Sequence, residues 1–181
     1  MSVMDKIGVF CSSNNQVSQV FKDAARELGR WLGENKKTLV YGGNASGLME
    51  ELAQAAHQAG ARVYGVIPRK LMEEGRVSDA VDISFHCEDL NDRKEWLISE
   101  SEVMVAMPGS VGTLDEAFSA MAQNTFGMHD KLLVFYNVDG FYDSLFAFLD
   151  SLEARGVVNK PWPLVYRRAN TFAELIDILN S

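Results

Sequence analysis

The chain has 181 residues, of which 47% are hydrophobic and 23% charged, and its formal net charge is -8 at pH 7. This length suits a single domain that buries roughly 70% of the surface of its unfolded chain. The negative charge argues against DNA or RNA as the main partner, because phosphate contacts need clustered lysine and arginine. No apolar run approaches the roughly 20 residues that a membrane helix needs, so we expect no membrane partner either.

Strand-like and helix-like segments alternate along the whole chain. In chain order, the predicted elements are a strand over residues 6–12, a helix over 17–34, a strand over 38–41, a helix over 48–59, strands over 62–67 and 82–86, a helix over 89–99, a strand over 103–107, a helix over 113–125, a strand over 131–136, a helix over 141–154, a strand over 164–166 and a helix over 171–179. Such alternation with short connections implies a parallel sheet with helices on both faces. The sequence therefore predicts one α/β domain over residues 1–181, with a doubly wound, Rossmann-like fold.

The first residues and the cysteines bear on the expected location of the protein. Residues 1–6 lack the apolar region and the cleavage site of a signal peptide. Cys11 and Cys87 stand among apolar neighbours without metal-ligand spacing, and the three histidines lie far apart in the sequence. We therefore expect buried free thiols, a cytoplasmic location and no metal site.

Two glycine turns follow predicted strands, at residues 42–47 and 109–112. In a doubly wound fold, ligands bind beyond the carboxyl ends of the strands. The second turn joins the apolar run 103–107 to a helix, whose free N–H groups and positive dipole end favour a phosphate. The sequence therefore predicts a phosphate-binding loop formed by Gly109, Ser110, Val111, Gly112 and Thr113.

Two carboxylates, Asp115 and Glu116, follow this loop, although an anion site does not need them. A catalytic carboxylate beside a bound phosphate is one interpretation. The alternative is a capping box, in which Thr113 and Glu116 satisfy each other's backbone donors at the start of the helix. In either case the helix dipole is expected to keep Glu116 ionised.

The first glycine turn is only partly like a dinucleotide-binding fingerprint. Asn44 occupies the third position of G-x-G-x-x-G, and the next predicted strand ends in the basic pair Arg69-Lys70, where an acidic residue is expected. This pattern disfavours NAD and leaves a mononucleotide phosphate or sugar as the natural ligand. The alternative is that the glycines serve only tight packing between strand and helix.

A third segment, residues 89–96, has two positive charges near the start of a predicted helix. Asp89 or Asn91 can cap the predicted helix. Arg93 and Lys94 then lie in early turns, where cations oppose the helix dipole unless an anion or a carboxylate compensates them. The alternative is a solvated helix face with an Asp89–Arg93 pair.

These three segments together resemble the Lonely Guy family, nucleoside 5′-monophosphate phosphoribohydrolases that often carry the description of possible lysine decarboxylases. The family's P-G-G-x-G-T-x-x-E corresponds to residues 108–116, with Ser110 in place of the second glycine. Its G-G-G-x-x-G-L-M-G corresponds to residues 42–50, with Asn44 and Glu50 departing. Its M-H-E-R-K corresponds to residues 90–94, which keep only the Arg-Lys pair.

The resemblance implies an enzyme that releases adenine, or an N6-substituted adenine of the cytokinin type, from its nucleoside 5′-monophosphate and leaves ribose 5-phosphate. It places Glu116 and Arg93 as the catalytic residues and needs no cofactor or metal. Further substrate contacts are expected from Gly42, Gly43, Asn44, Lys94, Asp115 and Ser12.

The resemblance also implies a homodimer, for which the apolar residues Phe118, Met121, Phe126 and Met128 could supply the interface, unless they are simply core. A non-hydrolytic nucleotide-binding or carrier protein of the same fold is the alternative function, and the departures at Ser110, Asn44 and residues 90–92 favour it. Decarboxylation with pyridoxal phosphate is not indicated, because no lysine with the required partners is recognisable.

Overall fold

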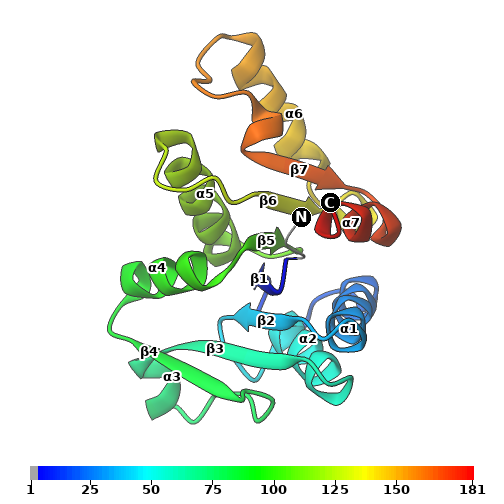
Figure 1. Cartoon of the computed structure of the whole chain (residues 1–181), viewed down its shortest axis with the longest axis vertical. Coiled ribbons are helices and arrows are strands. Elements are labelled where there is room, and N and C mark those ends of the chain that lie inside the picture. The colour runs from blue at the N-terminus through cyan, green and yellow to red at the C-terminus, as the bar shows by residue number, and fades with distance from the viewer. Residues whose placement is uncertain (1–3) are drawn as a thin grey trace.

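The computed structural model describes residues 4–181 and confirms the α/β fold class. Its strands are β1 (Lys6–Phe10), β2 (Thr38–Tyr41), β3 (Arg62–Pro68), β4 (Ile83–Cys87), β5 (Val103–Ala106), β6 (Leu133–Tyr136) and β7 (Tyr166–Ala169). They form one parallel sheet in the order β4-β3-β2-β1-β5-β6-β7 (Figure 1).

The helices follow the predicted ones closely. They are α1 (Gln19–Glu34), α2 (Gly47–Gln58), α3 (Arg69–Glu73), α4 (Leu90–Glu100), α5 (Val111–Phe126), α6 (Asp143–Ala154) and α7 (Phe172–Leu179). Among the α-helices, only α3 was not predicted, because five residues are too few to show an apolar period. The strand predicted over 164–166 instead begins at Tyr166, after a 3-10 helix over Trp162–Leu164. None of the helices in residues 4–181 is long and apolar enough to cross a membrane.

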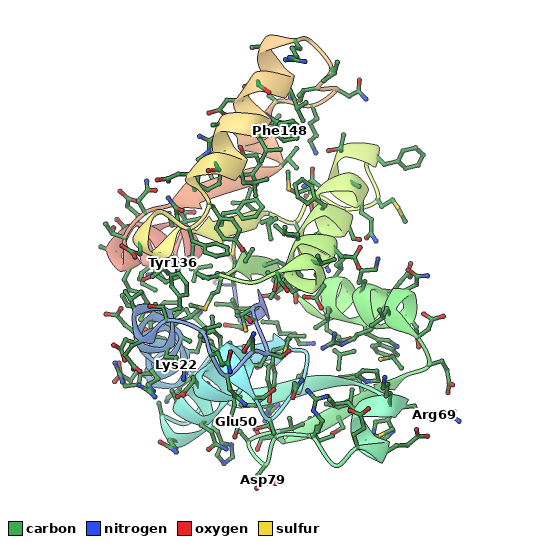
Figure 2. All side chains as sticks on the ribbon, turned by 180° about the vertical axis from the view of Figure 1, so that it is seen from behind. Lys22, Glu50, Arg69, Asp79, Tyr136 and Phe148 are labelled. Carbon is green, nitrogen blue, oxygen red and sulfur yellow. The ribbon has the colours of Figure 1, made fainter. Side chains whose placement is uncertain are left out.

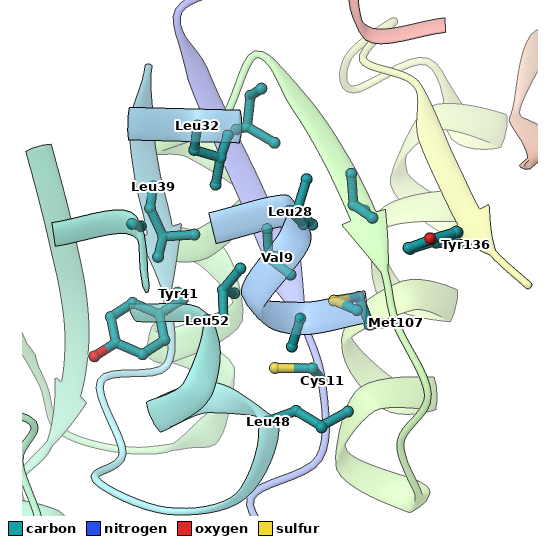
Figure 3. Close-up of a cluster of buried hydrophobic side chains, with 14 of the residues drawn as sticks. Val9, Cys11, Leu28, Leu32, Leu39, Tyr41, Leu48, Leu52, Met107 and Tyr136 are labelled. Carbon is teal, nitrogen blue, oxygen red and sulfur yellow. The ribbon is translucent and has the colours of Figure 1, made fainter. Parts of the chain in front are cut away.

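Two apolar cores lie on opposite faces of the sheet. Side chains of α1, α2 and α7 pack on one face, where Figure 3 shows Leu28 of α1 and Leu52 of α2 in one buried cluster with Val9 of β1. Side chains of α4, α5 and α6 cover the other face. Both cysteines are buried as free thiols, as predicted. Val20, at the start of α1, is apolar but 41% exposed.

The strand order reverses between β1 and β5. The chain adds β2, β3 and β4 outward from β1 and then returns to place β5 on the other side of β1. The loops that follow these two strands therefore meet, and the amide of Ser12 donates to the carbonyl of Pro108 at 3.1 Å. Ligands of doubly wound folds bind at such a reversal.

Candidate active site

The loop between β5 and α5 presents a row of free backbone donors. Within residues 4–181, no acceptor is bonded to the N–H groups of residues 109–113, and the first bonded amide is that of Leu114, which donates to Ser110 at 3.0 Å. Ser110, Val111 and Gly112 are exposed. Gly109 is half-buried and Thr113 is buried, so the donors of residues 110–112 are the ones that belong to exposed residues. They lie at the positive end of a 16-residue helix, an arrangement that suits a phosphate.

The capping-box alternative for this helix is wrong. α5 begins at Val111, with Ser110 at the N-cap position, two residues earlier than predicted. Thr113 therefore lies inside the helix and cannot be its cap. Glu116 lies in the second turn, and its carboxylate pairs with an arginine instead of a backbone amide.

The N-terminus of α2 differs from that of α5, because its donors are already used. The amide of Gly47 donates to Oδ1 of Asn15 at 2.8 Å, and that of Leu48 donates to the carbonyl of Ser12 at 2.8 Å. Gly47 has a φ of +61°, and a Cβ there would lie 2.4 Å from the carbonyl carbon of Ser13. At this helix start the glycine thus serves close packing, the alternative that the sequence left open.

Arg93 on α4 is held by three partners from distant parts of the chain. Its Nη2 donates to the carbonyl of Gly42 at 2.9 Å, and its Nε donates to the carbonyl of Val66 at 3.3 Å. Its Nη1 lies 3.4 Å from Oε1 of Glu116. With only 14% of its side chain exposed, the guanidinium is fixed in one orientation against the carboxylate.

The start of α4 shows why the predicted solvated face is wrong. Asp89 caps the helix, as predicted, and its Oδ1 accepts from the amides of Asn91 and Asp92 at 2.8 and 2.9 Å. The Asp89 carboxylate is therefore occupied at the helix end, and Arg93 turns inward to Glu116. A cation near a helix start is disfavoured by the helix dipole, and the Glu116 carboxylate supplies the negative charge that compensates it.

Glu116 is buried, with 7% of the residue exposed. Burial raises the pKa of its carboxyl group from 4.5 to about 7, while Arg93 and Lys94 lower it and Asp115 raises it. The expectation that the helix dipole keeps Glu116 ionised is thus wrong, because the loss of water around a carboxylate in the second turn outweighs the dipole. At neutral pH the group exchanges between its acid and its base form.

A second ion pair runs beside the first. Nζ of Lys94 lies 3.0 Å from Oδ1 of Asp115, so two consecutive residues of α4 pair with two consecutive residues of α5. The lysine side chain is 17% exposed and that of the aspartate 48%. This outer pair links the two helices and places one charge of each sign near Glu116.

The structure adds residues to this site that the sequence did not indicate. The carbonyl of Val66 helps to hold Arg93, and a backbone acceptor has no signature in a sequence. Cys11 is fully buried near Glu116, whose charge adds to the effect of burial in raising the pKa of the thiol. Asn44, predicted to contact substrate, is buried, and its Oδ1 accepts from the hydroxyl of Ser46 at 2.9 Å.

Comparison with known proteins shows relatives over nearly the whole chain. A family model described as "Possible lysine decarboxylase" matches residues 49–179. The chain is 36% identical to the probable cytokinin riboside 5′-monophosphate phosphoribohydrolase LOGL2 of Oryza sativa subsp. japonica, over 96% of this chain and 71% of that protein. It is 33% identical to the cytokinin riboside 5′-monophosphate phosphoribohydrolase LOG5 of Arabidopsis thaliana, over 97% of this chain and 77% of that protein.

Solved structures share the fold. The molybdenum cofactor carrier protein of Chlamydomonas reinhardtii superposes with a TM-score of 0.75 at 26% identity, over 97% of this chain and 96% of that one. The molybdenum cofactor binding protein of Rippkaea orientalis superposes with a TM-score of 0.70 at 25% identity, over 97% and 95% of the two chains.

Proposed function

The chain belongs to the Lonely Guy family, whose model carries the description of a possible lysine decarboxylase, and from this membership we propose that it hydrolyses the N-glycosidic bond of a nucleoside 5′-monophosphate. The substrate is AMP or an N6-substituted AMP of the cytokinin type, and the products are the free base and ribose 5-phosphate. One observation carries the proposal: the N–H groups of residues 109–113 have no acceptor within residues 4–181, and the last of them lies one helical turn from the buried Arg93–Glu116 pair.

The phosphate is seated on the N–H groups of residues 109–113. Backbone donors bind an anion without lysine or arginine, so the net charge of -8 does not oppose a small phosphate ester. Glu116 lies three residues beyond Thr113, a rise of about 5 Å along a helix. A ribose that extends from the phosphate along this turn brings its C1′ atom towards the Glu116 carboxylate.

The reaction breaks the bond between C1′ and the base nitrogen and forms a bond from C1′ to water. The sugar passes through a cation, which an ionised Glu116 stabilises. The same carboxylate accepts a proton from the attacking water and passes it to the departing base, which leaves as the neutral purine, so that Glu116 ends the cycle ionised. A group with a pKa of about 7 suits this exchange near neutral pH.

Arg93 and the outer ion pair position these groups. The guanidinium holds the Glu116 carboxylate in one orientation because its other donors are fixed by the carbonyls of Gly42 and Val66. Lys94 and Asp115 keep α4 against α5. Contacts of Ser12, Gly43 and Asn44 with the substrate stay predictions, as do direct contacts of Gly42, Lys94 and Asp115.

We also propose that the protein is a cytoplasmic homodimer. Phe118, Phe126 and Met128 are 37%, 87% and 66% exposed, whereas Met121 is buried at 4%. Phe118 lies in the middle of α5, Phe126 at its end and Met128 in the turn that follows. Phe118 and Phe126 border a hollow of about 420 Å³ between α5 and α6, whose lining is mostly apolar. A second copy of the chain would remove this surface from water.

A product assay tests the proposed hydrolysis. The protein is incubated with AMP, with N6-isopentenyl-AMP and with the matching nucleosides, and free base is measured by chromatography. We expect base from the monophosphates and far less from the nucleosides, because the seated phosphate supplies binding energy to the transition state. Equal rates on AMP and adenosine would contradict the proposal.

A carrier that binds the nucleotide without cleaving it is the second candidate. Two solved structures with this fold, 25–26% identical to the chain, are described as molybdenum cofactor carrier or binding proteins. Ser110, which stands where the family pattern has glycine, is a departure that favours the carrier. Its backbone is not left-handed and the residue is exposed, so a serine fits there without strain. Tight binding of AMP with no release of adenine would favour this function.

A further inference from the structure

A hollow of about 270 Å³ lies against the phosphate loop, and neither Arg93 nor Glu116 lines it. Gly109 and Ser110 form the edge that it shares with the row of free N–H groups. Val17, Phe21 and Phe141 form its apolar wall. We call this space the apolar hollow.

The apolar hollow and the catalytic pair lie on different sides of the phosphate loop. Arg93 is fixed by carbonyls that belong to β3 and to the residue after β2. The hollow is instead walled by Phe21 of α1, by Val17 just before that helix, and by Phe141, which follows the turn after β6. In the sheet, β2 and β3 lie on one side of the central β1–β5 pair and β6 lies on the other.

The wall of the hollow presents aromatic surface to solvent. Phe141 is 42% exposed, and its ring stands edge-to-face against that of Phe21, with centroids 5.5 Å apart and an interplanar angle of 83°. An aromatic group that enters the hollow would contact this ring pair and remove it from water. An apolar cavity of about 150 Å³ already holds a benzene ring, so the hollow is large enough for one.

The chemistry of the lining limits what the hollow can accept. Among the described residues that line it, none carries a charge; the polar ones are Ser12, Asn14 and Ser110. A second phosphate would find no cation there, whereas an uncharged apolar group would lose no ionic partner. The N–H groups next to it already hold the one phosphate of the proposed substrate.

We propose that the apolar hollow binds an uncharged aromatic or apolar group esterified to the phosphate, so that the site accepts nucleoside 5′-phosphodiesters. A tetrahedral phosphate carries ester oxygens in two directions. One leads the nucleoside towards Glu116, and the other leads the second group between Phe21 and Phe141. This inference rests on the phosphate seat of the proposed function.

The test compares two phosphodiesters of equal charge, adenosine 5′-(phenyl phosphate) and adenosine 5′-(methyl phosphate). Their dissociation constants are measured by calorimetry with the full-length Glu116→Gln protein, which prevents turnover. We expect the phenyl ester to bind about tenfold more tightly, the gain of one well-placed aromatic contact. Phe141→Ala removes this preference, and Phe148→Ala, on the exposed surface of α6, keeps it (Figure 2).

A second variant protects the test against misfolding of the first. Val17→Phe fills the hollow, so we expect it to weaken the binding of the phenyl ester while the affinity for AMP stays the same. Equal affinities of the two diesters would overturn the inference. The inference would also be overturned if Phe141→Ala weakened the binding of AMP as much as that of the phenyl ester, because the hollow would then hold the base of the monophosphate.

Failure of the proposed function is scored separately, by release of adenine from AMP with the unaltered chain. Preferential binding of the phenyl ester without release of adenine would refute the proposed hydrolysis and support the inference about the apolar hollow. A protein that releases adenine without any preference between the diesters would do the reverse.

Discussion

Gly42 and Arg93 touch across the ends of β2 and α4. The carbonyl of Gly42 accepts from Nη2 of Arg93 at 2.9 Å, and a Cβ on residue 42 would lie 1.9 Å from the same nitrogen. In the sequence this glycine looks like part of a nucleotide-binding turn. In the structure it leaves room for the arginine that orients Glu116.

The first prediction follows from this contact. Gly42→Ala should displace the guanidinium and lower the turnover of AMP about a hundredfold, the cost of misplacing a catalytic group by about 1 Å. In an Arg93→Ala background the same change should cost almost nothing further, because the obstructed group is gone. Turnover of the two single variants and the double variant checks this. Full activity of a folded Gly42→Ala protein would show that the contact is not needed.

The second prediction concerns Glu116→Gln. The amide keeps the shape of the side chain and removes the charge that the sugar cation needs, so turnover of AMP should fall by roughly two to four orders of magnitude. The affinity for AMP should change little, because backbone N–H groups hold the phosphate. Turnover and calorimetric binding measure the two quantities.

The matching change on the other side of the pair is Arg93→Ala, which should also lower turnover. The double variant should be far from additive if the two residues act as one unit. A folded Glu116→Gln protein with most of its activity would instead give this residue a purely structural role.

The third prediction is a pH dependence of stability and activity. The folded chain binds the Glu116 proton more tightly than the unfolded chain, since the pKa rises from 4.5 to about 7. The free energy of unfolding should therefore fall as the pH rises from about 4.5 to about 7, by up to about 3 kcal/mol. The ionised group does the chemistry, so turnover should rise over the upper part of this range. Urea unfolding and rate measurements across pH, with Glu116→Gln as the flat reference, check both.

The fourth prediction separates the outer ion pair from the inner one. Lys94→Met leaves Asp115 uncompensated and should move the titration of Glu116 to higher pH, whereas Asp115→Asn should move it lower. The double variant should lie between them. The midpoint of the turnover profile and NMR of ¹³C-labelled glutamate both report this titration. Identical midpoints in all four proteins would mean that the pair acts only as a link between α4 and α5.

The fifth prediction concerns the second copy of the chain. Phe126 is 87% exposed, so Phe126→Asp should leave the fold of each protomer intact while placing a charge in the proposed interface. Light scattering at micromolar concentration should give the mass of a dimer for the parent chain and of a monomer for this variant. Val20→Asp, on the opposite face of the sheet, is the control and should stay dimeric. A monomeric parent chain would refute the dimer.

Much of the site could be predicted because its signals are local. The turn at residues 109–112 lies between a buried strand and an amphipathic helix, so a phosphate-binding helix start is readable from consecutive residues. The basic pair Arg93-Lys94 near a helix start likewise predicts a compensating negative charge nearby. The identity of that charge was not predictable from the spacing, because it lies on another helix.

The sequence by itself determined the order of strands and helices, since apolar periodicity is set by neighbouring residues. Only the tertiary structure decided which of the two glycine turns keeps its donors free, because Ser12 and Asn15 occupy those of α2. It also decided the partners of Arg93, which lie 23 residues away at Glu116 and 51 residues away at Gly42. Such contacts arise from the way the sheet brings the ends of β2, β3 and β5 together, and the burial that follows gives Glu116 its pKa near neutrality.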